Sequence, residues 1–198
     1  MTDNDPQPRP VSASRTVITE LMIPSYANFG GKVHGGILLS LMDKAAYACA
    51  SRHAGTYCVT VSVDGVDFLR PADVGDLVSL KASVNYVGRT SLVVGIRVIA
   101  ENVQDNRKKH TNTCYFTMVA RDRDGNPVTV PPLILETDED IRRFVTAAER
   151  KRLRAQVRER MGTYKDEFTV DDRVCEAIAG ERCELRLQPG SSAPDHLA

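Results

Sequence analysis

The stretch Ile37-Leu-Leu-Ser-Leu-Met-Asp-Lys-Ala-Ala-Tyr-Ala-Cys-Ala-Ser-Arg52 decides the fold. It follows the pair Gly35-Gly36, contains neither glycine nor proline, and has Asp43 as its one acidic residue. Its apolar residues fall on nearly every face of a helix, which is typical of a buried central helix rather than a surface helix. We therefore predict a central helix over Ile37 to Arg52, surrounded by the rest of its domain.

Strand-like patterns lie on both sides of this predicted helix. Before it, Thr16 to Ile23 is rich in β-branched residues and ends at a proline. After it come four runs with a strand pattern: Tyr57 to Phe68, Leu77 to Val87, Ser91 to Asn102 and His110 to Arg121. Turn residues connect these runs, among them Pro71, Gly75-Asp76, Gly88 and Asp124-Gly-Asn-Pro127. This order predicts an α+β fold in which one antiparallel sheet curls around the central helix.

One sheet wrapped around one helix is incomplete by itself. The helix covers a single face of the sheet, and the edge strands present unpaired backbone N–H and C=O groups. Because both need a covering element, we expect the chain to form an oligomer.

The two ends of the chain differ in composition from the middle. Residues 1–14 are polar and proline-rich without an apolar run, so we expect a disordered tail rather than a signal peptide. Residues 15–136 hold the predicted sheet domain. Residues 137–187 are expected to form a helical extension, in which Asp138 to Arg160 is a charged helix with one narrow apolar stripe, and residues 188–198 a second disordered tail.

Composition argues against several classes of partner. The formal net charge is zero, so nothing predicts the basic surplus that nucleic acid or an anionic membrane demands. No stretch approaches the roughly 20 apolar residues that span a bilayer. The five cysteines form no C-x-x-C pair and the four histidines show no metal-ligand spacing, so we expect no metal site and a reducing, cytoplasmic location.

Asp43 is the first candidate for chemistry. A lone carboxylate is costly to bury, so a carboxylate on a buried helix is normally paired or functional. Spacing alone leaves three interpretations open: Asp43 is a catalytic group, it forms a salt bridge, for instance to Lys44 or Arg52 of another chain, or it lies on a face of the helix that is in fact exposed.

The residues just before the helix supply two further candidates. His34-Gly35-Gly36 leaves the backbone open where the first N–H groups of a helix point outward, which suits an oxygen that becomes an oxyanion. Asn28 carries an amide that can orient a water or polarise a carbonyl. The alternatives are a plain helix entry for the glycines and a turn for Asn28.

Spacing constrains how these groups combine. Gly36 and Asp43 are seven residues apart on one helix face, which a rise of about 1.5 Å per residue converts to about 10 Å. One reacting carbon hardly touches both groups across that distance. A site that uses both is more easily built from two copies of the chain.

The same segment resembles the hotdog-fold acyl-CoA thioesterases of the YciA and brain acyl-CoA hydrolase type. The resemblance covers roughly Thr16 to Pro132. Its motifs are short, but their order and spacing together are specific. They are Asn28, Gly31, His34-Gly-Gly36, Met42-Asp43, Thr60-Val-Ser-Val-Asp-Gly-Val-Asp-Phe-Leu-Arg-Pro71, Val74-Gly-Asp76, Gly88-Arg-Thr-Ser91 and Asp124-Gly-Asn-Pro127.

The resemblance implies a hotdog fold, a dimer with a continuous sheet, and assembly of such dimers into a trimer of dimers, a homohexamer. It implies that Asp43 is the catalytic carboxylate and that Asn28 is its partner across the dimer interface. The amides of Gly35 and Gly36, with His34 beside them, would hold the thioester oxygen. The residues that would lie by the coenzyme A (CoA) are Gly88, Arg89, Thr90, Ser91 and Arg70.

We therefore predict an acyl-CoA thioesterase that releases a carboxylic acid and CoA, with Asp43 as general base or as nucleophile. No cofactor is expected, because CoA is part of the substrate. Two alternatives on the same fold stay open: a non-catalytic acyl-CoA sensor and an enoyl-CoA hydratase or dehydratase. A scaffold whose C-terminal extension binds a partner is a further one.

Overall fold

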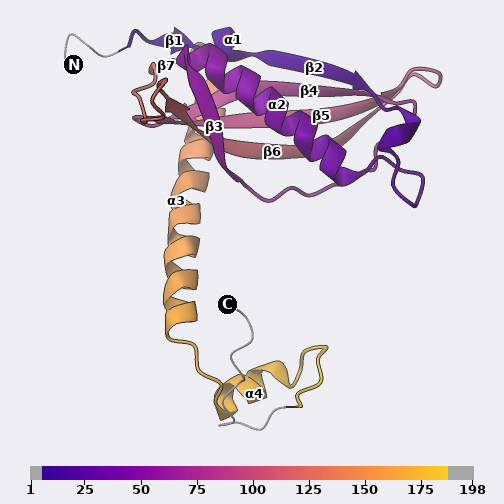
Figure 1. Ribbon diagram of the computed structural model, residues 1–198, viewed down its shortest axis with the longest axis vertical. Helices are drawn as coiled ribbons and strands as arrows, with labels where there is room; N and C mark the ends of the chain where they lie inside the picture. The colour runs from indigo at the N-terminus through magenta and orange to yellow at the C-terminus, as the bar shows by residue number, and fades with distance from the viewer. Residues whose placement is uncertain (1–5, 187–198) are drawn as a thin grey trace. The chain divides into compact units, whose positions relative to one another are not determined.

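The computed structural model describes residues 6–186; the expected tail at 188–198 and the first five residues lie outside them. Two compact units divide the chain, 1–149 and 150–198, and each is described by itself. The first unit contains a curled sheet with one long helix against its concave side (Figure 1). The predicted α+β hotdog architecture is confirmed.

The sheet has five strands in the order β2-β4-β5-β6-β3, and all neighbouring strands are antiparallel. The strands are β2 (Thr16–Leu21), β3 (Tyr57–Val63), β4 (Leu77–Val87), β5 (Ser91–Asn102) and β6 (Arg107–Arg121). The bounds of β4 and β5 are those predicted from the sequence. β3 ends before the expected Phe68 and β6 starts before the expected His110. Because β2 and β3 pair with a strand on one side only, the sheet has two open edges.

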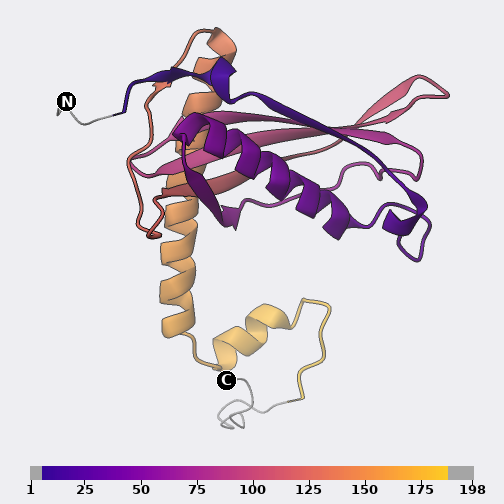
Figure 2. The same ribbon diagram turned by 45° about the horizontal axis from the view of Figure 1, so that its top comes forward.

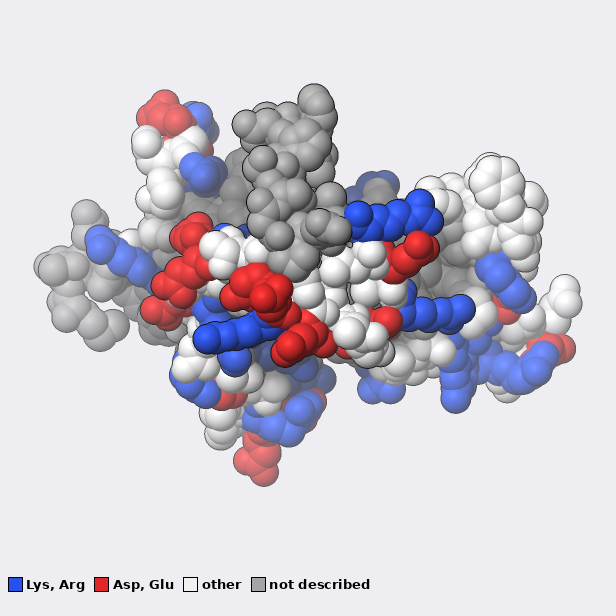
Figure 3. Space-filling view, turned by 90° about the horizontal axis from the view of Figure 1, so that it is seen from below, with Lys and Arg blue, Asp and Glu red and all other residues white. Residues whose placement is uncertain are grey.

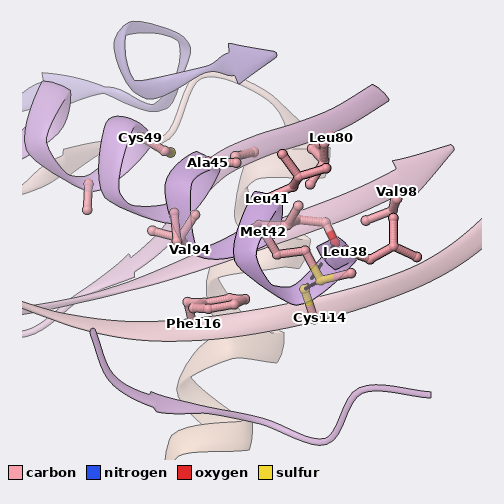
Figure 4. Packing of buried hydrophobic residues seen from close by; sticks show 14 of the residues in the cluster. Leu38, Leu41, Met42, Ala45, Cys49, Leu80, Val94, Val98, Cys114 and Phe116 are labelled. Atoms are coloured by element: carbon pink, nitrogen blue, oxygen red, sulfur yellow. Dashed lines mark hydrogen bonds between the residues drawn. The ribbon is translucent and has the colours of Figure 1, made fainter. Parts of the chain in front are cut away.

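Helix α2 (Gly35–Ala54) is the predicted central helix, extended at both ends. Gly55 ends it in the left-handed conformation, with a φ of 73°, where a side chain would be strained. Figure 2 shows from a second direction how the strands curl around this helix. On the buried side of α2, the side chains of Leu38, Met42 and Cys49 point toward strand residues such as Val94 and Phe116 (Figure 4).

The opposite side of α2 is open, and here the sequence-based expectation of all-round burial is wrong. Leu39, Asp43, Lys44 and Tyr47 are exposed in the single chain. The sheet covers one side of the helix and α1 contacts it as well, but these four side chains stay uncovered in the described chain. Apolar residues at nearly every turn therefore indicate a helix that one chain buries only in part.

The N-terminal segment is ordered where a tail was expected. Strand β1 (Arg9–Pro10) pairs with β7 (Leu133–Ile134), and helix α1 (Val11–Ser14) follows directly. Val11 is 2% exposed, and the Ser14 hydroxyl accepts the N–H of Val84 in β4 at 3.0 Å. The buried side chain of Val11 and the hydroxyl of Ser14 thus hold this segment in place. The segment is too short to show an apolar periodicity in the sequence.

The C-terminal region is helical, as expected. Helix α3 (Asp138–Asp166) begins in the first unit, where the ring of Phe144 lies 5.1 Å from that of Tyr86 on β4. It continues into the second unit, which also contains α4 (Asp172–Ile178). Between residues 6 and 186, no helix is long and apolar enough to cross a membrane. Acidic and basic side chains are interspersed on the face seen in Figure 3, in keeping with the zero net charge.

Candidate active site

Asp43 lies midway along the open face of α2 and has one hydrogen-bond donor. The hydroxyl of Thr60 on β3 donates to Asp43 Oδ1 at 2.6 Å and also lies 3.2 Å from the sulfur of Met118. No described basic residue forms a salt bridge with Asp43, so the structural alternative of a salt bridge within the chain finds no support. The carboxylate is thus held by one neutral donor and stays open on its other side.

Thr60 is a residue of the candidate site that sequence reasoning did not single out. It belongs to the polar set of the alternating β3 run, which normally faces solvent. Here the strand is turned so that Thr60 faces α2, whereas Val61 and Val63 are 52% and 42% exposed. The available signal was the position of Thr60 at the start of its motif, in a strand directly after the helix with Asp43.

Asn28 is held in the loop before α2 by its own side chain. Its Oδ1 accepts the N–H groups of Gly30 at 2.9 Å and Lys32 at 3.1 Å, and its backbone N–H donates to the Lys32 carbonyl. The turn interpretation is therefore correct for the oxygen. The amide nitrogen has no bond partner in the described part of the chain and is exposed, so it can donate to another group.

The helix entrance differs in one respect from the expected pair of free N–H groups. His34 is the N-cap of α2, and its Nδ1 accepts the N–H of Gly36 at 2.9 Å. The Gly36 N–H is therefore occupied. The N–H of Gly35 has no bond partner among residues 6–186, so Gly35 alone is available as the predicted oxyanion donor. Capping by His34 also explains why a histidine stands there.

Exposed apolar side chains surround this entrance. A Cβ atom on Gly35 would lie 3.4 Å from the ring of Phe68, so the glycine leaves room for that ring. Phe68 is 45% exposed, Leu69 is 66% exposed, and Phe29 at the tip of the Asn28 loop is fully exposed. Exposed apolar side chains in the segments on either side of the helix entrance suit a binding or contact surface.

Ion pairs anchor the Asn28 loop to the sheet. Asp73 accepts Lys109 and Lys32, each at 2.6 Å, and Lys109 also contacts the buried Asp76 at 3.1 Å. Hydrogen bonds from Lys109 and then Lys32 lower the pKa of Asp73 below its usual value. The loop that carries Asn28 is thereby tied to β6 and to the turn before β4.

The residues predicted to contact CoA lie away from Gly35 within one chain. Gly88, Arg89, Thr90 and Ser91 form the tight β4–β5 turn, closed by the Gly88 N–H to the Ser91 carbonyl at 2.8 Å. The Arg89 carbonyl accepts the Val130 N–H, and next to it Pro131 accepts His53 near the C-terminal end of α2.

The turn and Gly35 therefore lie toward opposite ends of α2. Arg70 is exposed in the segment after β3, nearer the Gly35 end. Within residues 6–186 no three His, Cys, Asp or Glu residues are placed to hold a metal ion.

Comparison with known proteins decides the family. The model of the thioesterase superfamily matches residues 30–105. YkhA of Bacillus subtilis, named as an uncharacterized acyl-CoA thioester hydrolase, is 37% identical over 145 residues, 73% of this chain and 84% of its own length. The chain belongs to the hotdog-fold acyl-CoA thioesterases. The matched residues include Asp43, Thr60 and the β4–β5 turn.

Solved structures of this thioesterase family superpose on the chain. A hexameric acyl-CoA thioesterase has a TM-score of 0.74 at 39% identity, with 76% of this chain and 96% of that chain covered. The acyl-CoA hydrolase of Staphylococcus aureus, solved with butyryl-CoA and CoA, has a TM-score of 0.71 at 32% identity, with 79% and 96% covered. That protein has also been solved with an aspartate, an asparagine and a threonine each replaced by alanine.

Proposed function

We propose that this thioesterase hydrolyses acyl-CoA at Asp43, in a site that two copies of the chain build together. The observation that carries the proposal is the Asp43 carboxylate, held by Thr60 at 2.6 Å and open toward the uncovered side of α2. An open carboxylate with one fixed oxygen is oriented for reaction. No ion pair within the described residues neutralises its charge, although Lys44 is the next residue along α2.

The chemistry needs one carboxylate and one oxyanion donor. As general base, Asp43 takes a proton from water while the water oxygen attacks the thioester carbon. As nucleophile, Asp43 attacks that carbon itself and forms an anhydride, which water then hydrolyses. In both cases the carbon–sulfur bond breaks, the CoA thiolate takes up a proton, and a carboxylic acid leaves. Thr60 positions the carboxylate in either case.

A second copy of the chain can bring a helix entrance close to Asp43, which one chain does not do. Gly35 and Asp43 are eight residues apart on α2, about 12 Å along the axis, so one chain does not bring both to one carbonyl. If the open β3 edges of two copies pair antiparallel, their α2 helices lie side by side in opposite directions. Each helix entrance then approaches the middle of the other helix. The Gly35 N–H and the Asn28 amide of one copy can meet the Asp43 of the other.

The same proposed arrangement would bring the candidate CoA-binding residues of the two copies close together. The Gly88–Ser91 turn lies at the C-terminal end of α2, and the antiparallel pair moves that end beside the helix entrance of the other copy. Arg89 on one side and Arg70 on the other then provide cations for the CoA phosphates. This accounts for why these residues do not come together within one chain.

Exposed apolar residues support the dimer. The rings of Tyr47 on α2 and Tyr57 on β3 contact each other at a tilt of 58°, with centroids 5.8 Å apart, and both are about half exposed. With Leu39 and Val61 they form an apolar surface along the open edge. Because a related acyl-CoA thioesterase is hexameric, we propose that three such dimers assemble into a homohexamer.

The test is thiol release from a panel of acyl-CoA substrates by the wild type and by Asp43→Ala and Asp43→Asn. We expect the wild type to release thiol and both variants to lose nearly all activity, with unchanged oligomer size in solution. Asp43→Asn keeps the shape and the bond to Thr60, so it isolates the charge. Retention of most activity in either variant contradicts the role of Asp43.

The same panel separates the alternatives. An acyl-CoA sensor would bind the substrates in calorimetry without thiol release by the wild type. An enoyl-CoA hydratase would change the absorbance of an enoyl-CoA without thiol release. Neither result is expected, because an open, oriented carboxylate has no role in binding alone.

A further inference from the structure

The loop that carries Asn28 is held by polar contacts and not by burial. Residues 27–32 are all exposed, and Phe29 at the tip is fully exposed. Val33 is the first buried residue after them. Ordering a loop costs conformational entropy, and exposed side chains offset little of that cost by burial. The position of the Asn28 amide therefore depends on the bonds that fix this loop.

Lys32 connects Asn28 to the rest of the domain. Its backbone N–H donates to Asn28 Oδ1 at 3.1 Å, and its carbonyl accepts the Asn28 N–H at 2.6 Å. Its backbone forms an isolated antiparallel bridge with Asp73, and its ammonium group donates to Asp73 Oδ1 at 2.6 Å. Lys32 thus bonds to Asn28 through its backbone and to Asp73 through both its backbone and its side chain.

Asp73 is held by a second lysine. Its Oδ2 accepts Lys109 of β6 at 2.6 Å, and Lys109 also contacts Asp76 Oδ2 at 3.1 Å. The Asp76 side chain is 1% exposed, whereas that of Lys32 at the other end of the network is 52% exposed. Because a buried carboxylate needs its cation, Asp76 determines where the Lys109 ammonium group lies. Charges of alternating sign therefore lead from a buried carboxylate out to the exposed loop.

Lys109 differs in this respect from its two basic neighbours at the start of β6. Arg107 pairs with Asp105 in the adjacent turn, and Lys108 pairs with its cross-strand partner Glu101 at 3.3 Å. Both pairs stay within the β5–β6 hairpin. Figure 1 shows this hairpin and the loop before α2 at the same end of the sheet. Of three consecutive cations, Lys109 is the one that reaches from the hairpin toward the anchor of that loop.

We propose that Asp73 and Lys109 are positioning residues for thioester hydrolysis, which hold the Asn28 loop so that its amide meets the reacting group. The inference rests on the proposed function, in which Asn28 of one copy approaches Asp43 of the other. Asp73 and Lys109 act through Lys32 and do not touch the substrate. A donor is most effective when its position is fixed before the reaction. A displacement of about 1 Å can lower a rate by about a hundredfold.

Steady-state thiol release by the full chain tests the proposal, with Asp73→Asn as the key variant. The amide keeps the shape of the side chain and removes its charge, while Lys109 keeps its contact with Asp76. The matched control is Asp105→Asn, which removes the same charge from an exposed ion pair at the turn between β5 and β6. We expect kcat to fall about tenfold in Asp73→Asn, and the control to keep the kcat of the wild type.

A double-mutant cycle with Asn28→Ala separates positioning from a general loss of structure. If Asp73 acts through Asn28, Asp73→Asn should lower kcat little further once the amide is gone. A structural role alone would lower kcat by the same factor with and without the amide.

Hydrogen exchange of the loop gives a readout besides activity. The backbone N–H groups of Gly30 and Lys32 are bonded to Asn28 Oδ1. We expect them to exchange faster in Asp73→Asn than in the wild type or in Asp105→Asn, because the loop opens more often when its anchor is weakened.

The lysine provides an independent arm of the same test. Lys109→Arg keeps the charge and should retain most of the wild-type kcat, whereas Lys109→Met should lose about as much as Asp73→Asn. Lys108→Met is the matched control and should behave like the wild type. Because Lys109→Met leaves Asp76 buried without its cation, thermal unfolding is followed in parallel, and kcat is measured well below the transition.

Three results would overturn the proposal: a wild-type kcat in Asp73→Asn, equal losses with and without the Asn28 amide, or unchanged exchange in the loop. If Asn28→Ala itself keeps the wild-type kcat, the role of Asn28 fails and this proposal fails with it. Loss of activity in Asp43→Ala would then still support hydrolysis at Asp43, so the two failures are distinguishable.

Discussion

The side of α2 that faces the sheet is apolar and closed, whereas the side that carries Asp43 is open and combines a carboxylate with exposed apolar side chains. On the closed side, Met42, Ala45 and Cys49 are completely buried against the strands. On the open side, Asp43 has one hydrogen bond and exposed tyrosines next to it. One chain buries the side chains of the closed side completely, and this burial stabilises the fold. In the proposed dimer, a second copy supplies the groups that the open side lacks within one chain.

The largest effect should follow from a charge on the apolar surface at the open edge. Val61 on β3 is 52% exposed there. In Val61→Asp a carboxylate would lose its hydration at the proposed dimer interface, which costs several kcal/mol when it has no partner. We expect separation into smaller species in light scattering and at least a hundredfold loss of thiol release at low protein concentration.

Val103→Asp is the matched control for this variant. Val103 is 58% exposed, at the turn between β5 and β6, away from the open edge. It should keep the wild-type size and activity. If Val61→Asp kept both as well, the interface would lie elsewhere and Asp43 would work without the second copy.

The next largest effect should come from Asn28. Asn28→Ala removes the amide donor and the turn acceptor together, and we expect thiol release to fall by roughly ten- to a thousandfold, as for other oxyanion or water-positioning donors. Asn28→Asp separates the two roles, because its carboxylate still accepts from Gly30 and Lys32 but no longer donates. A similar loss in both variants assigns the role to the donor. Normal activity in Asn28→Asp would leave Asn28 as a turn residue.

A smaller loss is expected when the donor to Asp43 is removed. Thr60→Val keeps the shape of the side chain but not the hydroxyl, and a hydrogen bond to a charged group contributes about 1.5–3 kcal/mol. Because Asp43 is partly open, we expect the lower part of this range, about a tenfold decrease in kcat. Thr60→Ser retains the hydroxyl and should stay close to the wild type. Equal loss in both would point to the methyl group and the contact with Met118.

The bounds of the central strands were easier to predict from the sequence than those of the edge strand β3. β4 and β5 were predicted to the residue because Gly88 ends one strand and their alternation is regular. β3 was predicted too long: its apolar pattern continues to Phe68, but after Val63 the chain leaves the sheet and bonds to β6 through single groups such as the Leu69 N–H. An alternating apolar pattern indicates which residues can be buried, but it does not indicate where the hydrogen-bonded pairing of two strands ends.

The site was predictable in its residues but not in its geometry. Asp43 and Asn28 were identified from the sequence, and their roles stay predictions. The open face of α2 was only one of the alternatives for Asp43, since alanine and leucine on every side fit a helix buried in one chain as well as a helix that a second chain covers. The bond from the Gly36 N–H to His34 depends on how the imidazole ring is rotated. The bond from Thr60 to Asp43 depends on how the edge strand β3 is oriented. Neither leaves a periodic signal in the sequence.

The smallest effect on turnover should come from the closed side. Leu80 on β4 is completely buried and points toward α2 (Figure 4). Leu80→Ala removes contacts and leaves a cavity, so urea unfolding should show a loss of about 2–5 kcal/mol in the free energy of unfolding. The folded fraction should release thiol at nearly the wild-type rate, because no group on the open side moves. A large fall in kcat with little loss of stability would show that the two sides of α2 are coupled, and the division drawn between them would then be wrong.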